Sequence, residues 1–230
     1  MVSLDIAIHT SEGVQDYCQD QYGDPLKSAD VAKVYIEQAF EKINSSGTAR
    51  IESDAIPVPI EDTNKAFDAC CPCYSSCFLC NYDKLYDWWK DWHGCNNVID
   101  GGNCNILITA GGGGGRGGGD YATAASGKEI SDLPTSPPLN AGSTSSPHAM
   151  WITLQEVGHA LHDFSSLSDN DGDGDKYHDT GVVRKSDGTN YVTPIGVNGT
   201  SNDCFEGVPS DREQGDLRYS DCTASYFEGA

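Results

Sequence analysis

The stretch from Ile152 to His162 constrains the fold more than any other part of the chain. Set on a helix at about 100° per residue, its apolar residues share one side: Leu154, Val157, Ala160, Leu161 and Phe164. The polar residues fall on the opposite side, within roughly 60° for the first three: Gln155, His159 and His162, flanked by Glu156 and Asp163. An ordinary surface helix also separates apolar from polar side chains. Two histidines with two carboxylates on one face instead indicate a core helix whose polar side carries a functional site.

Patterns of strand and helix alternate along the rest of the chain. Strands are expected at 4–9, 49–60 and 105–109, and helices at 29–43, 82–92 and from Ser146 onward. Pro57 and Pro59 make the second strand an edge or irregular one, and a loop containing Cys18 is expected before the first helix. This alternation predicts an α/β fold with a mixed, twisted sheet and long helices.

A glycine-rich run follows the strand at 105–109. Gly111 to Gly119 contains eight glycines interrupted only by Arg116. The run lacks the Gly-Lys-Ser/Thr ending of a phosphate-binding loop. We therefore expect a mobile or closely packed surface loop.

Acidic residues dominate the composition, with 35 Asp and Glu against 14 Lys and Arg and a formal net charge of −21. Nucleic acid and anionic lipid both require a basic surface, so neither is expected as a main partner. No apolar run is long enough to span a bilayer, and no membrane insertion is expected. Such acidity is typical of a halophilic or calcium-binding protein.

Ten cysteines are present, five of them clustered at 70–80. Two interpretations compete: a disulfide-linked extracellular protein, and a cysteine metal or iron–sulfur site. Cys77-x-x-Cys80 has zinc-knuckle spacing, but no second pair lies at a matching distance. Glycosylation sequons at Asn44 and Asn198 favour the disulfides. We expect an extracellular or cell-surface protein whose export signal precedes this chain, because residues 2–5 already have a strand pattern.

The sequence Leu154-Gln-Glu-Val-Gly-His-Ala-Leu161 resembles the H-E-V-G-H-A-L helix of metzincin-type zinc metallopeptidases, with Gln155 in place of the first histidine. In the intact motif two histidines bind Zn²⁺, and the glutamate takes a proton from the metal-bound water. The order of strands and helices before this helix is similar to that family's upper subdomain. The resemblance implies a secreted zinc endopeptidase with Glu156 as general base and His159 as a metal ligand.

The C-terminal segment 219–227 resembles the short terminal helix of the adamalysin-like branch of this family. That resemblance implies a disulfide between Cys204 and Cys222. It also implies an upper subdomain over residues 1–165 and an irregular, disulfide-linked C-terminal subdomain over residues 166–230.

The zinc site departs from the family pattern at two ligand positions. Gln155 replaces the first ligand, and Ser165 stands where the third is expected. A glutamine amide is a poor zinc ligand. His159 and His162, three apart on one face, are close enough to share a metal, and His178 or Asp163 would complete the site.

No methionine follows Met150 in this chain, so the segment that corresponds to the family's methionine turn lacks its methionine. Thr193-Pro194-Ile195-Gly196 is the expected counterpart, with Ile195 as an apolar floor beneath the site.

A second metal site is predicted after the helix. Carboxylates alternate there as in the first half of a calcium loop: Asp169, Asp171, Asp173 and Asp175, with Asp179 to close it. The twelfth position is Thr180 rather than glutamate, so this is not a complete EF-hand. Aspartates at this density repel each other unless a cation is present.

Two functions are expected from these observations. The first is a zinc endopeptidase whose peptide substrate lies antiparallel to an edge strand, as the resemblance implies; the strand residues are Ile106, Leu107, Ile108 and Thr109. The second is an inactive pseudo-protease that serves as an extracellular binding or structural module, which Gln155 and Ser165 favour.

Overall fold

The structure, a computed structural model, describes residues 2–40, 45–96, 102–136, 140–141, 146–162, 178, 183–186, 189–195 and 214–227. The described helices are α1 (Glu12–Tyr22), α2 (Lys27–Ala39), α3 (Leu85–Cys95), α4 (Gly127–Ser131), α5 (Ser146–Leu161) and α6 (Asp221–Ser225). The central sheet contains β1 (Val2–Thr10), β2 (Ser45–Ile51), β5 (Cys104–Ile108), β6 (Gly115–Gly118) and β7 (Tyr121–Ala124). The other strands are β3 (Phe67–Cys70), β4 (Leu79–Tyr82), β8 (Asn140–Ala141), β9 (Val183–Ser186), β10 (Thr189–Val192) and β11 (Gln214–Asp216). None of these helices is long and apolar enough to cross a membrane.

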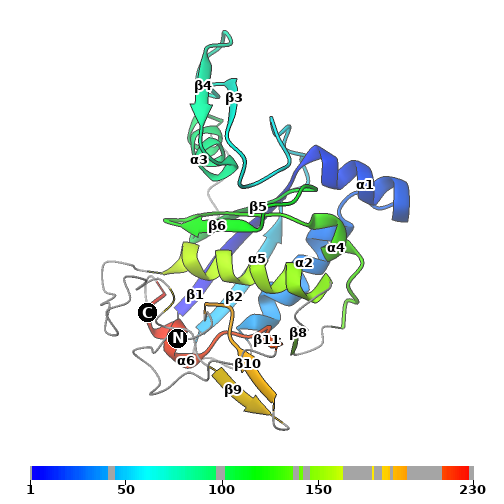
Figure 1. Cartoon of the computed structure of the whole chain (residues 1–230), viewed down its shortest axis with the longest axis vertical. Helices are drawn as coiled ribbons and strands as arrows, with labels where there is room; N and C mark the ends of the chain where they lie inside the picture. Colours follow the sequence, from blue (N-terminus) through cyan, green and yellow to red (C-terminus); the bar gives the residue numbers. More distant parts are fainter. Residues whose placement is uncertain are drawn as a thin grey trace.

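The central sheet has the strand order β2-β1-β5-β7-β6. β1 pairs in parallel with β2 and β5, and β5 pairs in parallel with β7. β6 runs antiparallel to β7 and forms one edge of the sheet (Figure 1). A smaller sheet, β8-β11-β10-β9, mixes both orientations in the C-terminal part. Helices packed around a mixed sheet confirm the predicted α/β class.

Helices cover both faces of the central sheet (Figure 1). Alternate residues of β1, among them Leu4, Ile6 and Ile8, join the large core beneath α2, α4 and α5. Leu107 of β5 faces the other way, into a smaller cluster with Trp88 and Trp89 of α3. The period-two alternation of a strand therefore divides its residues between two cores. We refer to these as the α5 face and the α3 face.

The expectation that residues 106–109 form an edge strand is wrong. β5 lies between β1 and β7, and every one of its residues is buried. A strand buried on both faces is continuously apolar, and this pattern did not distinguish a central position from an edge. The edge beside α5 is β6, inside the run of glycines expected to be a loop.

Residues 12–22, expected to be a loop, form α1. Ser11 caps the helix by accepting a hydrogen bond from the Val14 N–H, and Gly23 ends it at φ 70°. The Glu61 carboxylate accepts hydrogen bonds from Ser11 Oγ at 2.8 Å and from the Ala110 N–H at 2.7 Å. Glu61 thereby joins the start of α1 to the loop after β5. The irregular strand expected at 49–60 is shorter, because β2 ends at Ile51.

The clustered cysteines form disulfides. β3 and β4 make an antiparallel hairpin that projects from the α3 face (Figure 1), and we call residues 67–82 the cysteine hairpin. Cys70–Cys77 and Cys71–Cys80 close it, and Cys73–Cys95 ties it to the end of α3. Its tip exposes Tyr74, Phe78 and Leu79 by 63%, 63% and 67%. The disulfide interpretation of this cluster is confirmed, whereas Cys18 and Cys104 are buried free thiols.

Two predictions concern parts outside the described residues. The expected subdomain boundary at 165 and 166 falls in the undescribed range 163–177. Cys222 is disulfide-bonded, but its predicted partner Cys204 is not among the described residues.

Candidate functional site

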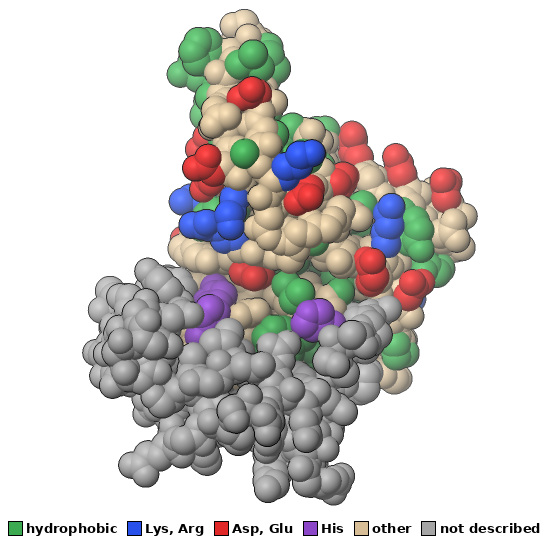
Figure 2. Space-filling model, in the orientation of Figure 1, with side chains coloured by type: hydrophobic (Ala, Val, Ile, Leu, Met, Phe, Trp, Pro, Cys, Tyr) green, Lys and Arg blue, Asp and Glu red, His purple; other side chains and the backbone are tan. Residues whose placement is uncertain are grey.

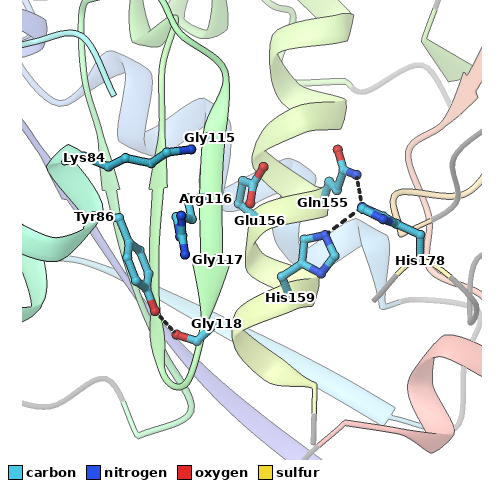
Figure 3. Close-up of a pocket in the computed structure, with 10 residues that line it drawn as sticks. All are labelled: Lys84, Tyr86, Gly115, Arg116, Gly117, Gly118, Gln155, Glu156, His159 and His178. Carbon is cyan, nitrogen blue, oxygen red and sulfur yellow. Dashed lines mark hydrogen bonds between the residues drawn. The ribbon is translucent and has the colours of Figure 1, made fainter. Parts of the chain in front are cut away.

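A cleft of about 490 Å³ lies between α5 and the edge strand β6 (Figure 3). Gln155, Glu156 and His159 of α5 form one wall, together with His178. The opposite wall consists of Gly115 to Gly118 of β6, and of Lys84 and Tyr86 where α3 begins. The polar face predicted for the helix at 152–162 therefore opens into a cavity.

The glycines of β6 allow α5 to lie directly against the strand. A Cβ atom at Gly117 would come within 2.0 Å of the Glu156 carbonyl oxygen, and one at Gly115 within 2.4 Å of Glu156 Cγ. No side chain fits at such distances. Of the two outcomes expected for this glycine run, close packing is the one observed at β6.

Glu156 lies at the base of the cleft with 8% of its surface exposed. Burial raises the pKa of its carboxyl group to about 8, although the Gly117 N–H, Lys84 and Arg116 all favour the charged form. A carboxyl group with a pKa near neutral can accept and release protons at physiological pH. Its position suits a general base, whereas a pKa of about 8 keeps most of the carboxyl group protonated at neutral pH.

His159 and His178 meet at the mouth of the cleft. Their Nε2 atoms lie 3.2 Å apart, and Gln155 Nε2 lies 3.1 Å from the same nitrogen of His178 (Figure 3). Burial lowers the pKa of His159 well below its usual value, with His178 and His162 adding to the shift. His159 is therefore held in the neutral form, which is the form that binds metals.

The donor set around His178 suits a shared cation. An imidazole nitrogen carries one lone pair or one proton, so His178 Nε2 cannot make a full hydrogen bond to both Gln155 and His159. Two imidazole nitrogens on one tetrahedral zinc ion lie about 3.3 Å apart, close to the separation of His159 and His178. A half-turn of the Gln155 amide would present its oxygen as a third, weaker donor. The side chains thus supply two imidazole nitrogens and one amide, one strong ligand short of the three that a catalytic zinc site uses.

The described residues contain no group of three His, Cys, Asp or Glu side chains that could hold a metal ion. The third member of this cluster is an amide, Gln155. The predicted calcium ligands Asp169, Asp171, Asp173, Asp175 and Asp179 all lie outside the described residues.

His162, also predicted as a ligand, lies near enough to His159 and His178 to interact with them electrostatically. It does not line the cleft. Its ring is buried against Tyr226 and Phe227, and it forms an isolated β-bridge with Phe227. Spacing on the helix placed it near His159, and the C-terminal segment packs against its ring.

Ile195, predicted as an apolar floor beneath the site, packs against the back of α5 and does not line the cleft. It is fully buried, and its Cδ1 would lie 2.5 Å from a Cβ atom at Gly158 of α5. Tyr219 packs at the same glycine and donates a hydrogen bond from its hydroxyl to the Leu154 carbonyl. The back of the helix is therefore fixed by close contact at Gly158.

The cleft wall opposite α5 was missed by sequence reasoning. Lys84 and Tyr86 were assigned only to an aromatic helix, and Arg116 only to a glycine run. The alternation of glycine, arginine and glycine at 115–117 was the available signal, because it places one side chain between two positions of close approach. Comparison of the sequence with models of known families and with curated proteins gave no match.

Proposed function

We propose that this chain is a secreted, zinc-dependent endopeptidase of metzincin-like type. The observation that carries the proposal is one cleft in which Glu156 lies beside the paired nitrogens of His159 and His178. The resemblance of residues 154–161 to the metzincin helix points to the same chemistry from the sequence.

The edge strand β6 is suited to bind the substrate. A peptide can add to the edge of a sheet through main-chain hydrogen bonds, and β6 is the last strand of the central sheet. The substrate position predicted at Ile106–Thr109 therefore moves to Gly115–Gly118. A peptide on this edge crosses the cleft in front of Glu156 and His159.

Each side chain then has a defined task. Glu156 accepts the proton of the attacking water and returns it to the leaving amine. His159 and His178 would hold the ion, with Gln155 as a weaker ligand. A zinc ion bound there would supply a Lewis acid and an activated water. A calcium ion at 169–179 and halophilic adaptation of the acidic surface remain part of the proposal.

The alternative function is an inactive pseudo-protease that keeps the fold as an extracellular binding or structural module. Gln155 favours it, because replacing an imidazole by an amide weakens zinc binding by orders of magnitude. The raised pKa of Glu156 would then describe a protonated, buried carboxyl group without a catalytic task.

Metal content and chelator-sensitive peptide hydrolysis distinguish the two functions. Bound zinc together with hydrolysis that a chelator abolishes supports the peptidase. Glu156→Gln should remove the hydrolysis and leave the far-UV circular dichroism unchanged. Gln155→His should raise zinc affinity at least tenfold. A purified protein with neither zinc nor chelator-sensitive cleavage, in which Gln155→His restores both, is the pseudo-protease.

A further inference from the structure

Two basic side chains stand on the cleft wall opposite α5. Lys84 directly precedes α3, Arg116 lies in β6, and both line the cleft (Figure 3). The whole chain has 14 basic residues against 35 acidic ones. Figure 2 shows a group of Lys and Arg side chains above one of the exposed histidines, with acidic side chains nearby and over much of the described surface. This wall of the cleft therefore has a local charge opposite to that of the whole protein.

Tyr86 holds Arg116 in place. The tyrosine is buried, and its hydroxyl donates a hydrogen bond to the Gly118 carbonyl of β6. The Arg116 guanidinium lies 5.4 Å from the centre of the Tyr86 ring, which is a cation–π distance. Asp87 and Asp120 act on Tyr86 electrostatically. The Tyr86 ring thus restricts the positions that the Arg116 guanidinium adopts.

Neither cation forms an ion pair within the described residues. The salt bridges found there join Lys33 to Glu37, and Arg50 to Asp5 and Glu52. Glu156 lines the same cleft and feels the charge of both Lys84 and Arg116, but it forms no ion pair with either. Both basic groups can therefore also attract an anionic ligand.

The register of β6 decides which side chains of a bound peptide meet these cations. Side chains at Gly115 and Gly117 would point into α5, so Arg116 points to the α3 side, where Lys84 and Tyr86 lie. A peptide paired with β6 alternates in the same way. Every second side chain of the peptide therefore faces Arg116 and Lys84, and the others face α5.

We propose that the cleft selects peptides that carry an Asp or Glu side chain at a position facing Lys84 and Arg116. This inference rests on the proposed peptidase function and adds the substrate class. Two partly exposed charge pairs should give a preference of about tenfold for the acidic peptide over its amide counterpart. The preference should fall as ionic strength rises, because the pairs are screened.

The test uses short quenched fluorescent peptides that differ only by Asp against Asn, moved one position at a time across the scissile bond. kcat/KM is measured for each, at the lowest salt concentration that preserves the far-UV circular dichroism spectrum. Binding of the same peptides to the Glu156→Gln protein is measured by fluorescence anisotropy. The variants are Lys84→Gln with Arg116→Gln, and Lys128→Gln as the control. Lys128 lies over Tyr17 and does not line the cleft.

The proposal is supported if Asp is preferred at alternate positions and the double variant removes the preference while Lys128→Gln keeps it. Equal kcat/KM for Asp and Asn peptides, or a preference that survives the double variant, overturns it and leaves the peptidase function standing. If no peptide is cleaved but acidic peptides still bind through Lys84 and Arg116, the peptidase function fails and the anionic binding site stands.

Discussion

On the α5 face of the central sheet, α2, α4, α5 and α6 bury a large apolar core; Cys104 lies there as a free thiol, and Cys222 of α6 is disulfide-bonded. On the α3 face, one helix and the cysteine hairpin bury a much smaller cluster and share three disulfides. A short hairpin cannot bury enough apolar surface to be stable alone, and cross-links reduce the entropy of its unfolded state. Within the described residues, the α5 face is therefore stabilised mainly by apolar burial, and the α3 face depends more on covalent bonds.

The glycines of the two faces differ in how closely atoms of other elements approach them. Gly115, Gly117 and Gly158 allow atoms of other elements to approach α5 and β6 closely. Gly94 of α3 has no atom within 4 Å of the position where its Cβ would lie. Close packing at glycines therefore occurs beside the candidate site, as it does at Gly47 and Gly111, whereas Gly94 faces solvent.

The largest effect is expected from Gly117→Ala. The new methyl group would meet backbone atoms of Glu156, which cannot move aside without shifting α5. We expect a loss of about 4 kcal/mol in the free energy of unfolding, measured by urea denaturation. Gly112→Ala is the control, because its Cβ meets nothing within 4 Å. Equal stability of the two variants would contradict the close packing of α5 on β6.

Removal of the Cys73–Cys95 bridge should act on the α3 face alone. The double variant Cys73→Ala with Cys95→Ala opens a loop of 22 residues and should cost about 3 kcal/mol. Hydrogen exchange followed by mass spectrometry should show faster exchange in α3 and the cysteine hairpin, with α5 unchanged. Cys18→Ala, which removes a free thiol, should cost about 1 kcal/mol. Faster exchange throughout α5 would show that the two faces are not independent.

His9 should make the α3 face sensitive to acid. Burial lowers the pKa of His9 to about 4; Glu52 opposes this shift, and His93 and Arg50 add to it. In the unfolded chain the pKa of His9 is about 6.5. Between these values the unfolded chain binds a proton that the folded chain excludes, so stability falls as pH drops from about 6.5 to about 4. His9→Gln should remove roughly 2–3 kcal/mol of this decline. Parallel curves of unfolding free energy against pH for both proteins would refute the assignment.

The smallest expected effect is a gain in the free energy of unfolding. Gly94→Ala in the exposed part of α3 should stabilise the protein by about 0.8 kcal/mol, because alanine favours a helix over glycine. Thermal unfolding monitored by circular dichroism would detect it as a small rise in Tm. A destabilised variant would mean that α3 is packed more tightly than Gly94 indicates.

The helices and strands that could be predicted from the sequence are those whose own residues show an apolar pattern. α5 was recognisable because its apolar residues recur at helical spacing, and β1 and β5 because their apolar runs are bounded by polar segments. β6 has no such pattern: glycines have no side chains to alternate, so pairing with β7 and contact with α5 define the strand. α1 is polar along most of its length, and Glu61, which helps fix its start, is 50 residues away.

The residues of the candidate site also divide into those that spacing within one element predicts and those that only the fold brings together. Glu156 and His159 follow from spacing on one helix. His178 was proposed, but its contact with His159 spans 19 residues, and spacing could not choose it over His162. Lys84 and Arg116 come from different elements and meet only because β6 forms the edge of the sheet.

The Cys73–Cys95 bridge also has a mechanical consequence. It closes the cysteine hairpin and α3 into one covalent loop, and Lys84 and Tyr86 sit inside that loop, at the cleft. The exposed tip at Tyr74 and Phe78 is therefore covalently linked to the segment that forms one wall of the cleft, while α5 packs in the large core. The cleft thus lies between a wall held by a disulfide and a wall held by apolar packing.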